Sequence, residues 1–348
     1  GGTFAIESPT PYSKEAQNLM TDLGINPPAL ERKCAVPGVY AGLRPAFFFS
    51  KETFGVDRLV TGMPGGEGGI ASQIAAGLWR EFLKQTPLPE EVQHDIARLE
   101  EEKVDYMPGL SQAEKKARLS KMSYRDFLLD HVKVHPGVIP FYQGRTHDLY
   151  GVGIDAVPAL DCWAYGYPGF AGMNLDRVPS PGLGYTATGE VTERPPYFFH
   201  FPDGNASIAR MLVRALIPGS VSGHTAEDIV TAKVDYSRLD AKNSPVKIRL
   251  NSTVARARHL GDPASAKEVE VTYVQGKQVY TVRAKSVVMA CWNMMIPYLC
   301  PELPEPQKEA LKYGAKVPLV YTVVAIRNWR AFHKLGIQHV TSPGMYHD

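Results

Sequence analysis

The stretch KEVEVTYVQGKQVYTVRAK, residues 267–285, constrains the fold more than any other part of the chain. Its apolar residues alternate with polar ones on both sides of Gln275-Gly276-Lys277, which predicts a β-hairpin. A further strand is predicted before it in VKIRLNSTVARARHL. The run SVVMA that follows is continuously apolar, as in a strand buried on both faces of a parallel sheet. Ligands usually bind at the carboxyl end of such a strand, which here is formed by Ala290 and Cys291.

A second informative pattern is FHFPDGNASIARMLVRALIP, which predicts a strand, a tight turn and an amphipathic helix in succession. The helix is expected to begin near Ser207, where its first N–H groups would point at an anion or a cofactor edge. Asn205 is a natural N-cap, and its side chain is expected to accept a hydrogen bond from the N–H of Ser207 or Ile208. The turn comprises Pro202, Asp203, Gly204 and Asn205.

Helical and extended patterns alternate along the rest of the chain. Residues 13–24 have helical spacing and end at Gly24 as a C-cap, whereas residues 45–62 suit a hairpin. Residues 70–134 are predicted to be mostly helical, because apolar residues recur every three to four positions. Residues 135–196 are rich in Gly, Pro, Trp and Tyr without a clear period, and so long a loop is usually functional. A long strand is predicted in KVPLVYTVVAIRNW.

Composition excludes several classes of function. A length of 348 residues suggests two domains, and a net charge of +2 gives no electrostatic argument for nucleic acid or an anionic membrane. No apolar run is long enough to span a bilayer. The cysteines have no C-x-x-C or zinc-finger spacing, so neither a metal site nor a covalently attached haem is predicted, and buried free thiols are expected. They are Cys34, Cys162, Cys291 and Cys300.

The chain also contains a partial dinucleotide-binding pattern, because Gly66, Gly68 and Ala71 match G-x-G-x-x-A. Gly62, Pro64 and Gly65 interrupt the strand that should lead into it, so a glycine loop before a helix is the better interpretation. Walker, H-E-x-x-H and G-x-S-x-G motifs do not occur in the sequence, and no catalytic residue is identified from spacing.

The order of a strand, HFPDGNASIARML, LNSTVARARHL, a hairpin and AKSVVMACW resembles the middle of the flavin-dependent amine oxidase family. More narrowly, GGTFAIESPTPYS, FFFSKETFGVDRLV, PGFAGMNL and FHFPDGNASIARMLVRALIP resemble its bacterial spermidine dehydrogenase branch. The resemblance implies a partial α/β, FAD/NAD(P)-binding Rossmann-like fold with a β-hairpin insertion, together with a mixed α+β substrate domain. It assigns residues 1–30 and 197–312 to the flavin domain, and residues 31–196 and 313–348 to the substrate domain.

The resemblance also implies which residues meet FAD. Gly1, Gly2 and Thr3 match a backbone stretch close to the flavin ring, where a side chain would clash. The turn from Pro202 to Asn205 would lie near the flavin, and the backbone of Val254 would meet the adenine. In family members one strand ends beside the FAD pyrophosphate, and the residues here that match this strand end are Ala290, Cys291 and Trp292. For Val254 and Ala290, simple sheet packing is the alternative.

Family members carry a Rossmann fingerprint before the position where this chain begins and a further flavin-binding segment after the position where it ends. The chain starts at GGTFAIESP without methionine. We therefore expect an interior piece of a longer protein, which by itself would not hold FAD tightly.

The reaction implied by the resemblance is the oxidation of a polyamine or another amine. Flavin accepts a hydride from the carbon next to nitrogen, and the imine is then hydrolysed. Aromatic walls attract a cationic amine, although ordinary core packing is the alternative reading of the same side chains. The aromatic candidates are Trp163, Tyr165, Tyr167 and Phe170. Asp161 and Asp176 are candidates to bind the distal amino groups of a polyamine.

Alternatives stay open at this point. Another flavoprotein of the same fold, such as an amino-acid oxidase or a desaturase-like enzyme, would show similar patterns, and so would a binding protein without the cofactor. The resemblance leaves open the electron acceptor, a homodimer, and a location in the periplasm or at a membrane. A haem would be non-covalent, because the chain lacks C-x-x-C-H.

Overall fold

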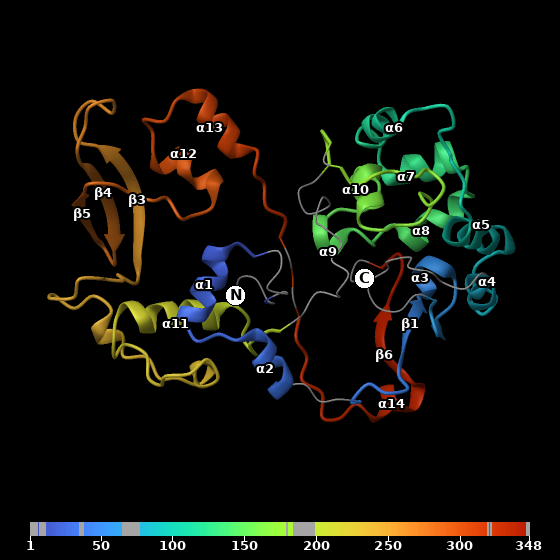
Figure 1. The fold of residues 1–348 in the computed structure, drawn as a ribbon, viewed down its shortest axis with the longest axis horizontal. Helices are drawn as coiled ribbons and strands as arrows, with labels where there is room; N and C mark the ends of the chain where they lie inside the picture. The colour runs from blue at the N-terminus through green and yellow to red at the C-terminus, as the bar shows by residue number, and fades with distance from the viewer. Residues whose placement is uncertain are drawn as a thin grey trace. The chain divides into compact units, whose positions relative to one another are not determined.

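The computed structural model describes residues 6, 12–34, 38–64, 77–178, 180–183, 199–318, 320 and 322–345. In this part the chain is mixed α/β with two three-stranded sheets. It divides into two compact units, each assembled from two stretches of chain (Figure 1). Unit 1 comprises Gly1–Pro37 and Thr192–Lys316, and unit 2 comprises Gly38–Val191 and Val317–Asp348.

Unit 1 is organised around an antiparallel sheet with the order β3-β4-β5. Its strands are β3 (Ser252–His259), β4 (Val269–Gln275) and β5 (Gln278–Ala284). The predicted hairpin is confirmed, because Gln275 pairs with Gln278 across Gly276, whose φ is +62°. The helices are α1 (Lys14–Asp22), α2 (Pro27–Cys34), α11 (Ala206–Leu216), α12 (Ile296–Leu299) and α13 (Glu305–Lys312), with 3-10 turns η4 (Asp228–Val230), η5 (Tyr236–Arg238) and η6 (Asn293–Met295).

The core of unit 1 forms where helix α11 meets the segments before and after it. Phe199 and Phe201 come from the segment just before the turn that leads into α11, and Met211 lies on the apolar face of the helix. A helix with apolar residues every three to four positions gains stability by burying that stripe. The other buried members are Ile6, Ile25, Leu30, Val221, Ala226 and Ile229. The helix predicted over residues 13–24 is confirmed as α1, followed by Gly24 at φ +71°.

Unit 2 contains a mixed sheet with the order β2-β1-β6. Strand β1 (Arg44–Phe49) runs antiparallel to β2 (Arg58–Thr61) and parallel to β6 (Ile337–Thr341). The hairpin predicted over residues 45–62 is thus confirmed, with the short helix α3 (Lys51–Phe54) at its tip. The remaining helices are α4 (Leu78–Leu83), α5 (Glu90–Glu101), α6 (Gln112–Leu119), α7 (Tyr124–Asp126), η1 (Phe127–Val132, a π-helix), η2 (Pro136–Val138), α8 (Ile139–Tyr142), α9 (His147–Tyr150), α10 (Ala159–Ala164) and α14 (Arg330–Leu335).

Aromatic side chains dominate the core of unit 2. The ring of Phe47 on β1 lies 5.2 Å from that of Phe141 and 5.8 Å from that of Phe82. Helix α5 contributes Val92, Ile96, Ala97 and Leu99, which share one face because they recur at helical spacing. The helical prediction for residues 70–134 is confirmed from Leu78 onward, whereas residues 70–76 and the glycine pattern at 66–71 lie outside the described residues.

Two predicted strands do not form. Residues 286–290 form no strand, and Val288 is 88% exposed, so the prediction of a strand buried on both faces was wrong. The described residues of 316–329 form no strand either, and Val320 is 85% exposed. A parallel strand depends on hydrogen bonds to neighbouring strands, and neither run is part of either sheet in the described part of the chain.

Two smaller predictions also change. Of the strand expected before Pro202, residues 197 and 198 lie outside the described residues, and the described part shows a single bridge between Ile6 and Phe199. The loop expected over residues 135–196 contains short helices in its described part, including α8, α9 and α10. Its sequence shows no period because each helix is only four to six residues long.

Candidate functional site

The turn before α11 is built around an internal carboxylate. Gly204 has φ +68°, a left-handed conformation that glycine adopts without strain, and its N–H donates to the carbonyl of Phe201 at 2.8 Å. Asp203 accepts a hydrogen bond from the Ser207 hydroxyl at 2.6 Å and forms an ion pair with Arg210. A negative charge at the start of a helix is favourable, and here the chain supplies it itself.

This arrangement corrects the prediction for Asn205. Asn205 stands at the N-cap position of α11, but its side chain makes no capping hydrogen bond. Asp203 provides the negative charge at the helix start instead, because its carboxylate reaches Ser207 in the first turn and Arg210 one turn later. The sequence signal for this was the spacing of Asp203, Ser207 and Arg210, which places the three side chains on one side of the helix start.

Replacing Asp203 by alanine is expected to destabilise unit 1 by about 1–2 kcal/mol, because Ser207 loses its acceptor and Arg210 loses its counter-charge. Hydrogen exchange of the α11 amides, measured beside thermal unfolding, would report the change. Asp203→Asn is the matched control, since it keeps an acceptor for Ser207 and removes only the charge, and it should lie between the wild type and Asp203→Ala. Equal protection in all three proteins would contradict the proposed role of the carboxylate.

The other residues that the resemblance assigns to FAD binding lie in unit 1 on or after the sheet, where the structure describes them. Val254 is 39% exposed on β3, next to a register shift between Val254 and Arg256. Ala290, Cys291 and Trp292 are exposed, and the Trp292 indole donates to the carbonyl of Gly314 at 3.2 Å. Helix α12, which follows this segment closely in sequence, packs against β3 (Figure 1). Gly1, Gly2 and Thr3 lie outside the described residues.

The cysteines differ from the expectation of buried thiols. Cys162 is buried, but Cys291 is exposed and Cys300 is partly exposed, so that expectation was wrong for Cys291. The side chain of Cys34 is not among those described. Burial raises the pKa of Cys162, and the carboxylate of Asp161 raises it further. Cys162 is therefore an inert core thiol rather than a nucleophile.

The aromatic candidates in unit 2 separate into core and partly exposed residues. Phe170 is 4% exposed, and its ring stacks on Phe127 at 4.6 Å. Tyr167 packs against the core, donates its hydroxyl to the carbonyl of Arg145 at 2.5 Å, and has a raised pKa because of burial. Trp163, Tyr165 and Tyr167 are all partly buried, and Trp163 packs against the core as Tyr167 does. The alternative of ordinary core packing thus describes Phe170 fully and Tyr167 in part.

Trp163 has two cations close to its ring. The Lys116 ammonium and the Arg177 guanidinium are each 5.7 Å from the centre of its indole ring. Such contacts are attractive, because the ring face carries partial negative charge. Both cations also bond carbonyls, Lys116 that of Val178 at 3.0 Å and Arg177 that of Ala164 at 3.1 Å. The ring therefore already has cationic partners within the chain.

The two acidic candidates differ in their surroundings. Asp176 forms an ion pair with Lys116, and this hydrogen bond, with a further one from the N–H of Val178, lowers the pKa of Asp176. Its charge is therefore neutralised internally. Asp161 is 6% exposed on α10, beside Cys162, and contributes to a raised pKa at Tyr150, where burial is the larger cause. The carboxylate of Asp161 is thus close enough to Tyr150 to affect the pKa of its hydroxyl.

A buried ion pair in unit 2 has no counterpart among the residues predicted from sequence. The Glu100 carboxylate on α5 accepts a hydrogen bond from the Tyr142 hydroxyl at 2.9 Å and lies 3.7 Å from the Arg145 guanidinium. The guanidinium also lies 4.4 Å from the centre of the Tyr142 ring. Burial raises the pKa of Glu100, while Arg145 and the Tyr142 hydroxyl oppose that change. No local signal joins Glu100 to Arg145, because Glu100 is on α5 and Arg145 lies in the turn between α8 and α9.

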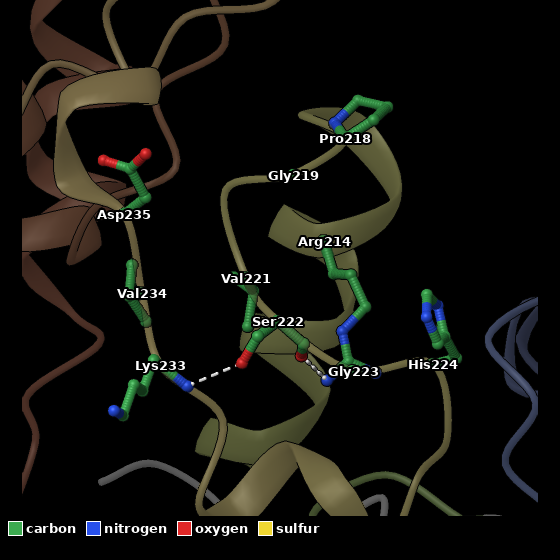
Figure 2. Close-up of a pocket in the computed structure, with 10 residues that line it drawn as sticks. All are labelled: Arg214, Pro218, Gly219, Val221, Ser222, Gly223, His224, Lys233, Val234 and Asp235. Atoms are coloured by element: carbon green, nitrogen blue, oxygen red, sulfur yellow. Dashed lines mark hydrogen bonds between the residues drawn. The ribbon is translucent and has the colours of Figure 1, made fainter.

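A cavity of about 560 Å³ in unit 1 is the second feature that sequence reasoning missed. Figure 2 shows Arg214 of α11 bonding the Ser222 carbonyl at 2.6 Å, and the Ser222 hydroxyl accepting the N–H of Lys233 at 2.9 Å. Arg214 is also paired with Asp228 at 2.7 Å. The lining residues are Arg214, Pro218, Gly219, Val221, Ser222, Gly223, His224, Lys233, Val234 and Asp235.

The wall of this cavity is fixed by Asp228. Hydrogen bonds from the N–H groups of His224 and Thr225, followed by those of Arg214, hold the pKa of Asp228 well below its usual range. Thr225 accepts the N–H of Asp228 at 3.2 Å and donates its own N–H to the carboxylate at 3.0 Å, a reciprocal capping box. The T-x-x-D spacing was the signal in the sequence. The charge of Arg214 is therefore compensated within the wall of the cavity.

Comparisons with known proteins add no assignment, because no family model matches the chain and a search of curated proteins finds no match. Across the described ranges, no cluster of three or more His, Cys, Asp or Glu side chains could hold a metal ion. None of the helices described is both long and apolar enough to cross a membrane.

Proposed function

We propose that this chain is part of an FAD-dependent amine oxidoreductase similar to the spermidine dehydrogenase branch, with a Rossmann-like flavin domain in unit 1 and a substrate domain in unit 2. The observation that carries the proposal is the division of the chain. Each unit is assembled from two stretches, and the changes of unit after Pro37, Val191 and Lys316 lie near those that the resemblance implies at residues 30, 196 and 312.

In unit 1, residues on and after the sheet are available to contact a cofactor. The start of α11 is not available to a bound anion, because the Asp203 carboxylate already lies there. Val254 lies partly exposed on an edge strand and pairs with Tyr273, and the register shift leaves the next residue, Ala255, without a ladder partner, so backbone groups beside Val254 are available to an adenine. Ala290, Cys291 and Trp292 are exposed and can be reached by a ligand. Asp203, in contrast, already fills the anion position at α11, so the turn would meet FAD through the backbone of Gly204.

When bound, FAD would supply the acceptor for a hydride from the carbon next to the amine nitrogen. The chain's own contribution would be to position the amine and exclude water. Of the predicted wall residues, Trp163 and Tyr165 remain partly exposed and Asp161 offers a buried carboxylate near Tyr150. Asp176 contributes a fixed ion pair with Lys116 that orients the cation beside Trp163.

The proposal is tested by the spectrum of the purified protein that contains this chain. It should show flavin absorbance, and adding spermidine without oxygen should bleach that absorbance as the flavin is reduced. Bleaching by amino acids alone would favour an amino-acid oxidase. A colourless protein with a well-formed fold would favour a binding protein without the cofactor and would overturn the proposal.

A substitution at Gly204 tests its contact with the cofactor. Gly204→Asn keeps the left-handed backbone, which asparagine tolerates, but adds a side chain. If the turn abuts the flavin, flavin absorbance per protein should fall by at least half while thermal unfolding of the flavin-free protein changes by only a few degrees. Full flavin content in Gly204→Asn would mean that the glycine serves only the turn.

A further inference from the structure

Strand β5 (Gln278–Ala284) is an unprotected edge of the sheet in unit 1. In the described part of the chain it pairs only with β4, and six of its seven residues are exposed. Its sequence, QVYTVRA, has no proline and one charged residue, Arg283. Proteins normally blunt a sheet edge with proline, charges or a bulge, since a regular edge pairs with another strand.

The other edge of the same sheet is blunted. Strand β3 is interrupted by the register shift between Val254 and Arg256 and carries Arg256 and Arg258. Helix α12 also packs against it. The pairing of β4 with β5 continues without a shift from Gln275 to Ala284. Only β5 therefore combines a regular backbone with an accessible edge among the strands described in unit 1.

The hairpin turn sets the direction of the backbone groups on β5. Gly276 has φ +62° at the first central position of a two-residue loop, as a type II′ turn requires. In such a turn the N–H of Gln278 points to the carbonyl of Gln275. Because directions alternate along an antiparallel strand, Val279, Thr281 and Arg283 direct their N–H and C=O groups to the outer edge.

One face of the sheet is apolar, and its apolar residues on β5 are only partly covered. Across β3 and β4 it buries Ala257 and Tyr273, which are 5% and 9% exposed. On β5 the same face continues with Tyr280, stacked on Tyr273 at 5.4 Å, and with Val282 opposite Val271. These two are 39% and 41% exposed. A further strand beside β5 would extend the apolar face over them.

We propose that a second copy of this chain supplies that strand, with the two β5 strands antiparallel and Thr281 on the two-fold axis. This register pairs Val279 with Arg283 of the second copy, and Thr281 with its equivalent, through the outward backbone groups. On the apolar face it sets Tyr280 opposite Val282 of the second copy, twice, and aromatic with β-branched pairs are favourable. The inference does not depend on the proposed flavin chemistry.

The neighbouring registers are less favourable. Centring the axis on Tyr280 would set Val282 opposite Gln278 of the second copy, twice, and would lose the pairing of Tyr280 with Val282 on the apolar face. Centring it on Val282 leaves Val279 opposite Lys285, beyond the end of the strand. In the proposed register Lys277 faces Lys285 of the second copy, but both lie outside the strand and weaken the pairing only at its ends. The net charge of +2 on each copy does not oppose association strongly. Pairing through one seven-residue strand is a small contact, so we expect a weak dimer, with a dissociation constant on the order of 10 μM.

Charge exchange at Thr281 tests the register. The full chain should form dimers in sedimentation equilibrium as its concentration rises to about 100 μM, tenfold above the expected constant. Thr281→Lys and Thr281→Glu should each weaken the dimer by at least about tenfold, because two like charges meet at the axis. An equimolar mixture of these two variants should associate again. Thr253→Lys, the same change on β3, is the matched control and should leave the dimer intact.

Three outcomes would overturn the proposal. The wild-type chain could stay monomeric throughout this range of concentration. Thr281→Lys could keep the wild-type dissociation constant, which would place the interface elsewhere. Thr281→Lys and Thr253→Lys could weaken association equally, which would indicate a general effect of charge.

Discussion

Replacing Phe170 by alanine is expected to lower the stability of unit 2 by about 3–5 kcal/mol, because it leaves a cavity the size of a phenyl ring in the core. The ring is 4% exposed and stacks on Phe127 at 4.6 Å, with Tyr124 at 5.8 Å on the same stack. Hydrogen exchange of the α5 and α10 amides during urea unfolding would follow unit 2 separately from unit 1.

The control for this substitution is Leu149→Ala in the same unit, whose side chain is 53% exposed and which should change stability by less than about 0.5 kcal/mol. A Phe170→Ala protein that keeps its stability but loses affinity for amines would show that Phe170 is a wall of the substrate site. The core assignment of Phe170 would then be wrong.

Replacing Arg145 by methionine should destabilise unit 2 by about 3 kcal/mol at pH 7, because it leaves the buried Glu100 carboxylate without its counter-ion. The side chains of Arg145 and Glu100 are 20% and 5% exposed, so water replaces the lost partner poorly. Thermal and urea unfolding between pH 4 and pH 8 would measure the change.

The effect of Arg145→Met should depend on pH in a defined direction. Burial raises the pKa of Glu100 above its ordinary value of 4.5, so the folded state binds this proton more tightly than the unfolded state. The stability contributed by Glu100 is therefore present below pH 4.5 and is lost as the pH rises through the folded pKa. Removing Arg145 raises that pKa further, so the substitution should cost most at neutral pH and least in acid.

The double variant Glu100→Gln with Arg145→Met supplies the control. It removes the carboxylate as well as the cation, so its stability should be less dependent on pH than that of Arg145→Met and higher at pH 7. A cost for Arg145→Met that stays constant from pH 4 to pH 8 would contradict the electrostatic explanation. The loss would then be attributed to the packing of Arg145 on the Tyr142 ring.

Elements with a complete local signal were predictable from the sequence. The hairpin at Gly276 requires a positive φ at the first turn position and alternating apolar residues on both sides, and both are present within 19 residues. Helix α1 likewise has its N-cap Ser13 and the terminating Gly24 next to the pattern itself. Residues 286–290 and 316–329 have equally apolar patterns, but a strand needs a neighbour that its own residues do not specify.

The same distinction holds for the candidate sites. The sequence alone determined the turn from Pro202 to Asn205, the hairpin and the aromatic composition of the segment after α10, because each depends on residues close together in the chain. The tertiary structure alone decided that Asp203 rather than Asn205 provides the charge at α11, and that Phe170 is core while Trp163 contacts Lys116 and Arg177. It also paired Glu100 with Arg145. Burial and ion pairing are properties of side chains brought together from distant segments, so only the folded chain fixes which charges are neutralised and which rings are enclosed.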